Sequence, residues 1–128
     1  MNETVREWIV KAEADYATAG RELRASENAN LDAVCFHAQQ CVEKLMKGLL
    51  IHLRVVPPKT HDLVHLDSLL AQAGVGWSWP VDELRFLTRA SVDFRYPGES
   101  ADLQEAQRAV DIAARMRDKL RSLLEQQR

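Results

Sequence analysis

The sequence contains little that would mark a secreted, disulfide-stabilised or membrane protein. It has only two cysteines among 128 residues. Cys35 and Cys41 lie in one expected helix with Cα atoms about 9 Å apart, beyond the roughly 7 Å limit for a disulfide. No apolar run approaches the roughly 18 residues of a membrane span, and the opening residues MNETVREW lack the apolar core of a signal peptide. We therefore expect buried, reduced thiols and a cytoplasmic protein that does not bind membranes.

The chain also lacks a strong charge of either sign. Its formal net charge is -2, from 17 basic and 19 acidic residues. Such a chain has no overall positive field that would hold nucleic acid through counterion release. Any contact with RNA must therefore come from a local patch of basic residues.

What the sequence does contain is the composition of one folded domain. Hydrophobic residues make up 46% of the chain and charged residues 28%, which is too apolar for a disordered chain. Apolar residues recur every three or four positions, as in amphipathic helices, and no convincing strand remains. We predict a single all-α domain over residues 1–128, an up-and-down bundle of four long helices and one short helix.

The first two helices are expected to be long. The first spans roughly residues 3–25, and the second follows a cap at Asn28 or Asn30 and carries its apolar stripe as far as Leu53. Because the stripe of the second helix is unusually wide, we expect this helix to be central.

The third helix is expected to be short. Pro57 and Pro58 forbid a continuation of the second helix and force an extended link. Thr60 can cap the helix that follows, which ends near Gly74.

Two more helices complete the chain. Pro80 suits the first turn of a fourth helix, which breaks at residues 96–98. The last helix is expected to follow a cap at Ser100. Its core stripe is expected to contain Leu103, Ala106, Val110, Ala113, Met116, Leu120 and Leu123.

Polar residues interrupt the second helix, the most apolar one. Gln40, Glu43 and Lys44 are the central members of this polar block. One interpretation is structural, with pairs inside the helix and side chains that satisfy loop carbonyls. The other interpretation is a polar pocket at a seam between helices. The pattern leaves both open.

Arg95 and Tyr96 lie where the fourth helix stops and the fifth has not begun. Their side chains can enter a cleft next to the backbone amides of the last helix, a place that favours anions. Equally, Arg95 can bind the last carbonyls of its own helix while Tyr96 seals the end of the bundle.

No metal or other cofactor is expected. His61 and His65 are four residues apart and could share a metal, but no strong third ligand lies nearby in the sequence. No glutamate is followed by a histidine three residues later, which excludes the paired motif of a di-iron bundle.

Four segments carry a resemblance to a known family. They are Trp8 with Ala12 and Asp15, CFHAQQCVEKLMKGLL at 35–50, PKTHDL at 58–63, and FRYPG at 94–98. Together they resemble the HEPN domain family over nearly the whole chain. The second and third segments are the most specific, because they place polar residues where helical periodicity does not demand them.

The resemblance implies a bundle of four or five helices, frequently a homodimer. It also implies a minimal nucleotidyltransferase as partner, the two forming a toxin and its antitoxin. In some members of the family that partner attaches AMP to a tyrosine near a functional arginine. Tyr96, which follows Arg95, is the tyrosine available for that role here.

Many members of the family are metal-independent ribonucleases. Their signature is an arginine followed, after four to six residues, by a histidine at the start of the last helix. Arg95 matches the arginine, but no histidine follows it. The usual partner for proton transfer is therefore missing. His61 could replace it if the fold brings His61 close to Arg95 at one pole of the bundle.

Three hypotheses follow. The leading one is a binding module that pairs with a nucleotidyltransferase and holds a nucleotide or RNA phosphate near Lys59, His61, Arg95 and Tyr96. The second is an active ribonuclease toxin in which His61 is the base and Arg95 stabilises the developing charge. The third is a helical scaffold without a ligand.

Overall fold

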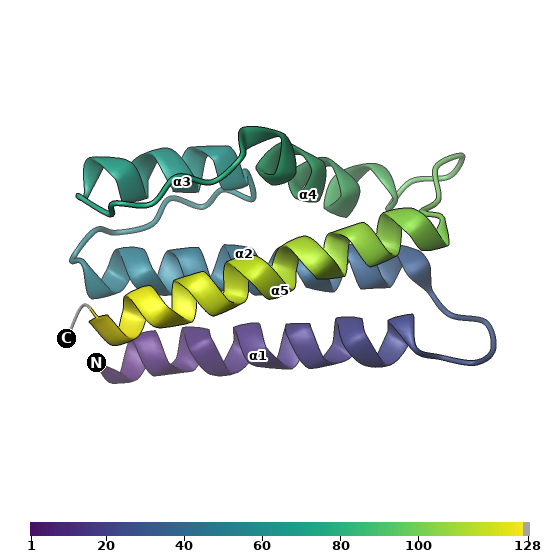
Figure 1. Cartoon of the computed structure of the whole chain (residues 1–128), viewed down its shortest axis with the longest axis horizontal. Coiled ribbons are helices and arrows are strands. Elements are labelled where there is room, and N and C mark those ends of the chain that lie inside the picture. The colour runs from purple at the N-terminus through teal and green to yellow at the C-terminus, as the bar shows by residue number, and fades with distance from the viewer. Residues whose placement is uncertain (127–128) are drawn as a thin grey trace.

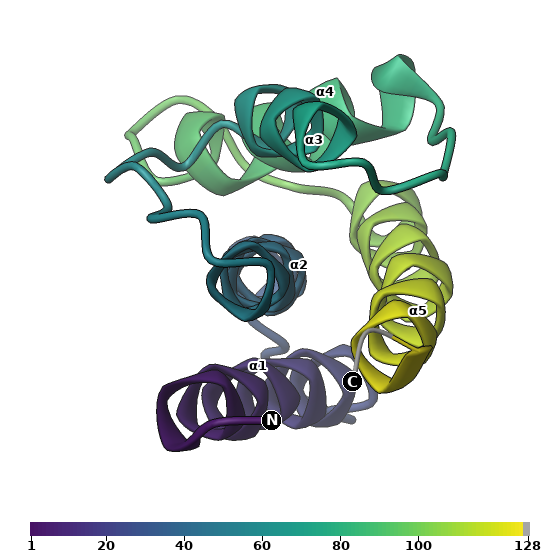
Figure 2. The ribbon, with the colours of Figure 1, turned by 90° about the vertical axis from the view of Figure 1, so that its left-hand side faces the viewer.

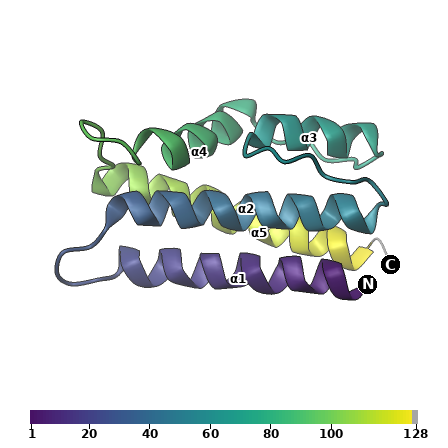
Figure 3. The ribbon, with the colours of Figure 1, turned by 180° about the vertical axis from the view of Figure 1, so that it is seen from behind.

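The computed structural model describes residues 1–126 and contains five helices and no strand within them. The helices are α1 (Glu3–Leu23), α2 (Leu31–His52), α3 (Leu63–Gln72), α4 (Val81–Asp93) and α5 (Leu103–Gln126) (Figure 1). The all-α fold class is confirmed. Figures 1 and 3 show that the chain runs in alternating directions through α1, α2, α4 and α5. Helix α3 is the additional short helix.

Short polar side chains start the helices where the backbone amides need partners. Asn2 Oδ1 accepts a hydrogen bond from Val5 N (2.8 Å), and Asn30 Oδ1 accepts one from Ala33 N (3.0 Å). Asn30, rather than Asn28, is thus the cap of α2. These bonds satisfy amides that the first turn of a helix leaves free.

Two of the expected caps were wrong by two residues. The cap of α3 is Asp62, whose Oδ1 accepts from Val64 N, whereas Thr60 accepts from the amide of Asp62 itself. The cap of α5 is Asp102 rather than Ser100. Asp102 and Glu105 each accept a hydrogen bond from the other's backbone amide, the reciprocal arrangement of a capping box.

Helix α2 is the centre of the bundle. Figure 2 looks along α2 and shows α1 on one side, α5 on a second, and α3 with α4 on a third. Most residues of α2 are therefore buried, and its Leu45, Met46, Leu49 and Leu50 are among the largest fully buried side chains. The wide apolar stripe of this helix is explained by its three covered sides.

Residues 53–62 form an extended link that runs back beside α2, so that α3 begins near the middle of the bundle (Figure 3). Two hydrogen bonds fix this path. Gln39 Nε2 donates to the carbonyl of His61 (3.0 Å), and Leu63 N donates to Thr88 Oγ1 on α4 (3.1 Å). As a result α3 points in the same direction as α2.

Helices α1 and α2 approach closely at Gly48. A Cβ atom at this position would lie 3.2 Å from the Cβ of Trp8 on α1. The glycine therefore lets the two helices approach this closely, and a Cβ atom here would need Trp8 to move by a few tenths of an ångström. Within the described residues, no helix is both long enough and apolar enough to cross a membrane.

Candidate functional site

The polar block of α2 contains a buried carboxylate with several hydrogen-bond donors. Glu43 Oε1 accepts from Gln39 Nε2 (3.0 Å) and from Gln40 Nε2 (3.3 Å), and it lies 2.9 Å from His61 Nδ1. Glu43 Oε2 accepts from Lys47 Nζ (3.0 Å). The side chain of Glu43 is only 5% exposed. Buried polar groups of this kind are tolerated because they are fully bonded.

The protonation state of Glu43 follows from these contacts. Burial by itself raises the pKa of a carboxyl group. Hydrogen bonds from Gln39, His61 and Lys47, together with the charge of Lys47, outweigh burial and lower the pKa of Glu43. Glu43 is therefore a carboxylate at neutral pH. Since a carboxylate only accepts hydrogen bonds, the proton in the contact with His61 must be on Nδ1 of the imidazole.

A second carboxylate, that of Asp15, binds other polar residues of α2. Asp15 on α1 is buried, and its two oxygens contact His37 Nδ1 (2.7 Å) and Lys44 Nζ (2.6 Å) on α2. These contacts join α1 to α2 at half-buried positions.

The predicted members of the polar block therefore divide between two clusters. Gln40 and Glu43 belong to the Glu43 cluster, and Lys44 belongs to the Asp15 cluster. The bond from Gln39 to the carbonyl of His61 matches the structural interpretation of these polar residues. Sequence reasoning missed the roles of Gln39 and Lys47. Glu43 and Lys47 are four residues apart, a spacing that favours an ion pair within a helix, so the sequence offered a basis for predicting this contact.

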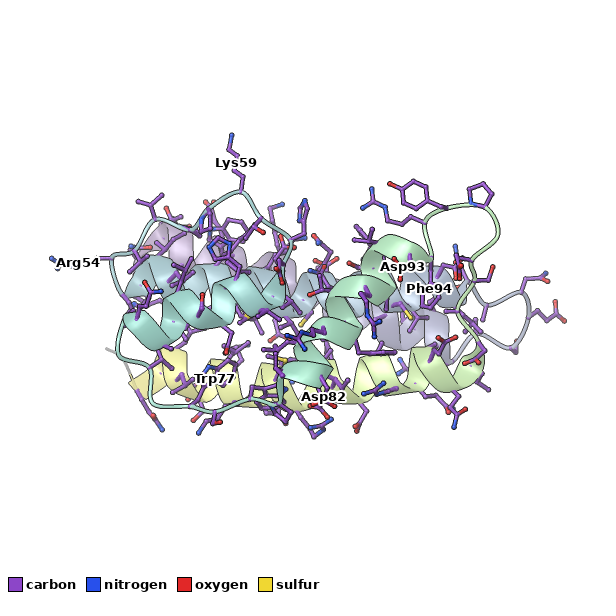
Figure 4. The ribbon with its side chains drawn as sticks, turned by 90° about the horizontal axis from the view of Figure 1, so that it is seen from above. Arg54, Lys59, Trp77, Asp82, Asp93 and Phe94 are labelled. Carbon is purple, nitrogen blue, oxygen red and sulfur yellow. The ribbon has the colours of Figure 1, made fainter. Side chains whose placement is uncertain are left out.

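His61 and Lys59 are exposed on the link. The side chain of His61 is 71% exposed although its Nδ1 contacts buried Glu43, so its Nε2 faces solvent. Figure 4 shows the side chain of Lys59 extending away from the bundle, apart from Asp93 and Phe94 at the end of α4. Lys59 is thus separated from the turn that contains Arg95.

Arg95 lies over an aromatic ring at the mouth of a groove. Its guanidinium carbon is 5.7 Å from the centroid of the Phe36 ring on α2. The groove has a volume of about 470 Å³ and is lined by Asn30, Asp32, Ala33, Phe36, Phe94 and Arg95. No carboxylate within residues 1–126 forms an ion pair with Arg95. Tyr96 follows in the same turn and is 62% exposed.

The structure does not bring the four predicted site residues together at one pole. Arg95 contacts α2 at Phe36, whereas His61 contacts it at Glu43. These two positions are about 10 Å apart along the helix axis. The cause is the returning link, which fixes His61 beside the middle of α2 instead of at its end. Arg95 and Tyr96 therefore form one place, and His61 forms another on the same helix.

Metal-ligating side chains do not gather in the part of the chain that the structure describes. No group of three or more histidine, cysteine, aspartate or glutamate side chains there is arranged to hold a metal ion.

These features define a five-helix bundle whose central helix carries the buried carboxylate of Glu43 and binds a second one, Asp15 of α1, through His37 and Lys44. The profile of the HEPN domain matches residues 5–123, nearly the whole chain. The chain therefore belongs to the HEPN domain family.

Two solved structures share the fold. TT1696 from Thermus thermophilus matches with a TM-score of 0.74 and 22% sequence identity, covering 99% of this chain and 100% of that one. ST0689, an archaeal HEPN homologue, matches with a TM-score of 0.69 and 22% identity, covering 96% of this chain and 99% of that one. No curated protein matches the chain significantly. At this identity the two structures support the fold alone.

Proposed function

We propose that this chain is a HEPN module that binds a nucleotide or RNA phosphate through Arg95 and acts with a minimal nucleotidyltransferase in a toxin-antitoxin-like pair. The observation that carries the proposal is the state of Arg95. Its guanidinium is exposed, is positioned over Phe36, and has no carboxylate partner among the described residues. A guanidinium in this state can donate two parallel hydrogen bonds to a phosphate.

Replacement of Arg95 tests the phosphate contact. Arg95→Ala should weaken binding of a fluorescein-labelled single-stranded RNA by about 10- to 150-fold, since a hydrogen bond to a charged group contributes about 1.5–3 kcal/mol. Arg85→Ala is the matched control, because Arg85 is also exposed and unpaired in the described chain but lies outside the groove. Circular dichroism must show that both variants are folded. Unchanged RNA binding by a folded Arg95→Ala variant would exclude this site.

The partnership rests on the family and on the exposure of Tyr96. In a nucleotidyl transfer, the phenolic oxygen of Tyr96 attacks the α-phosphorus of ATP, its proton passes to a base, and pyrophosphate leaves. Where a neighbouring gene encodes a minimal nucleotidyltransferase, its co-expression with this chain should yield a copurifying pair and an AMP adduct that Tyr96→Phe removes. Absence of both the complex and the adduct would exclude the partnership.

A second candidate function is a metal-independent ribonuclease, and one observation favours it. Glu43 holds Nδ1 of His61 and leaves Nε2 facing solvent, an arrangement suited to proton transfer. The separation of His61 from Arg95 argues against it, because one phosphate cannot easily reach both within one chain. We expect the purified protein to cleave RNA feebly or not at all. Robust cleavage that His61→Ala abolishes would reverse this ranking.

A further inference from the structure

The groove beside Arg95 has features beyond those that a phosphate requires. Its volume of about 470 Å³ falls within the range of roughly 300–1,000 Å³ that small-molecule sites occupy. It lies between the first turn of α2 and the turn that follows α4. Phe36 and Phe94 line it on the apolar side, and Asp32 and Arg95 are its charged residues.

Phe36 and Arg95 form a surface for stacking. The Phe36 ring is half-buried, lies beneath the Arg95 guanidinium, and is held from the side by His37, with ring centroids 5.3 Å apart and planes at 84°. Single-stranded nucleic acids place their bases against such aromatic rings and guanidinium planes. While its plane stacks, the edge of the Arg95 guanidinium still presents N–H groups to a phosphate.

Asp32 is positioned to read the base. Its Oδ1 accepts a hydrogen bond from Ala101 N (2.7 Å), which fixes the carboxylate in the wall of the groove. Its Oδ2 accepts no hydrogen bond from the described residues. An ionised carboxylate can only accept, so it suits a base edge with adjacent donors. Guanine presents two adjacent donors, N1–H and N2–H, whereas adenine, cytosine and uracil each place an acceptor beside their donor.

We propose that this groove binds the guanine base of a nucleotide or of an RNA strand. Asp32 accepts from N1–H and N2–H, the base stacks on the Phe36 and Arg95 surface, and Arg95 contacts the adjoining phosphate. This inference rests on the proposed function, because it adds base recognition to the same phosphate contact.

Binding of four nucleotides tests the inference. Isothermal titration calorimetry with GMP, AMP, CMP and UMP at one ionic strength should show GMP bound most tightly, by about 5- to 100-fold, as expected for a paired base contact. Asp32→Asn keeps the Oδ1 acceptor for Ala101 but replaces the other oxygen with a donor. It should remove the preference for GMP and leave AMP binding within about two-fold. Glu99→Gln is the matched control, since it removes an exposed carboxylate outside this groove.

Phe36→Leu provides a second variant that does not depend on Asp32. It retains an apolar side chain on α2 but removes the ring, and it should weaken all four nucleotides in a folded protein. A preference for GMP that survives Asp32→Asn, or nucleotide affinities that Phe36→Leu leaves unchanged, would overturn the inference. Equal binding of all four nucleotides that depends on Arg95 would overturn base recognition and leave the proposed phosphate contact standing. If neither nucleotides nor RNA bind, the proposed function itself fails.

Discussion

At the scale of single residues, the structure gives its clearest prediction about stability for a substitution of Glu43. Its partner Lys47 has a side chain that is only 9% exposed. Removing the carboxylate therefore leaves a buried ammonium without its counter-charge, which is strongly unfavourable. The contact between Glu43 and His61 adds little to the stability of the fold, because the side chain of His61 is largely exposed.

Glu43→Gln should lower the free energy of unfolding at neutral pH by about 3 kcal/mol. The loss should depend on pH. Because the pKa of Glu43 is lowered in the folded state, its contribution is complete above the ordinary value of 4.5 and is lost progressively as the pH falls from there through the lowered pKa of the folded state. Urea unfolding of wild type and Glu43→Gln at pH 7 and at about pH 3.5 measures the difference in their free energies of unfolding at each pH.

The gap between wild type and Glu43→Gln should therefore be smaller at the lower pH. Glu7→Gln, at an exposed position on α1, controls for the loss of one carboxylate and should leave stability nearly unchanged. An equal gap at both pH values would mean that Glu43 is not ionised as inferred.

The two cysteines should be inert in the native protein. Both are free and buried, and burial is the main cause that raises the pKa of each thiol to about 12. A thiolate is needed for reaction, so a disulfide-exchange reagent should label Cys35 and Cys41 only after denaturation. Rapid labelling of the native chain would contradict the placement of this face of α2 in the core.

The sequence showed a polar block within α2 but did not predict which partners its residues bind. Helical spacing places Gln40, Glu43 and Lys44 close together, and the structure nevertheless separates Lys44 from the other two. Their partners come from α1 and from the link, and the rotation of α1 against α2 cannot be read from the spacing within either helix. For the same reason the sequence shows Asp15 as a member of the family pattern but does not predict its contact with His37.

At the scale of helices, periodicity and breakers located all five elements because each has a continuous apolar stripe. The errors lie at the ends. Leu103 was expected in the core but is 53% exposed, since Asp102 caps α5 and places Leu103 in its first turn, before the stripe that begins at Ala106. The direction of α3 was not predictable either. It depends on hydrogen bonds between the link and α2, which involve residues distant in the sequence.

The close approach of α1 to α2 gives a prediction at this scale. Gly48→Leu should destabilise the protein by about 1–3 kcal/mol, because the new side chain begins 3.2 Å from Trp8 Cβ and must push α1 away. Gly20→Leu is the control. A Cβ at Gly20 meets only the end of the flexible Arg24 side chain, which can move aside. Thermal unfolding should separate the two variants, and equal midpoints would contradict the tight contact at Gly48.

At the scale of the whole molecule, the exposed apolar residues favour a homodimer. The core positions of α2 are buried within the single chain, so this helix offers no apolar face to a partner. The uncovered apolar side chains include Val81, Val92, Tyr96 and Leu103, which lie on α4, in the turn after it and at the start of α5. Exposed apolar groups on neighbouring elements are typical of protein interfaces.

We therefore expect light scattering at micromolar concentration to give about twice the chain mass of 14.6 kDa. Val92→Lys should shift the mass toward the monomer, since it places a charge on the exposed face of α4. Val10→Lys on α1 is the control, because Val10 is also exposed but α1 does not contact α4. A wild-type monomer under these conditions would refute the dimer.

The central position of α2 also determines how the molecule opens. Helix α2 contacts each of the other four helices, whereas α3 contacts only α2 and α4. A local fluctuation can detach α3, but no single helix can leave and expose every side of α2. In hydrogen–deuterium exchange, the amides of α3 should therefore exchange through partial opening, and those in the middle of α2 only when the whole domain unfolds. The helix that carries the buried carboxylate of Glu43, and to which Asp15 of α1 is bound, is thus the last part of the described chain to sample solvent.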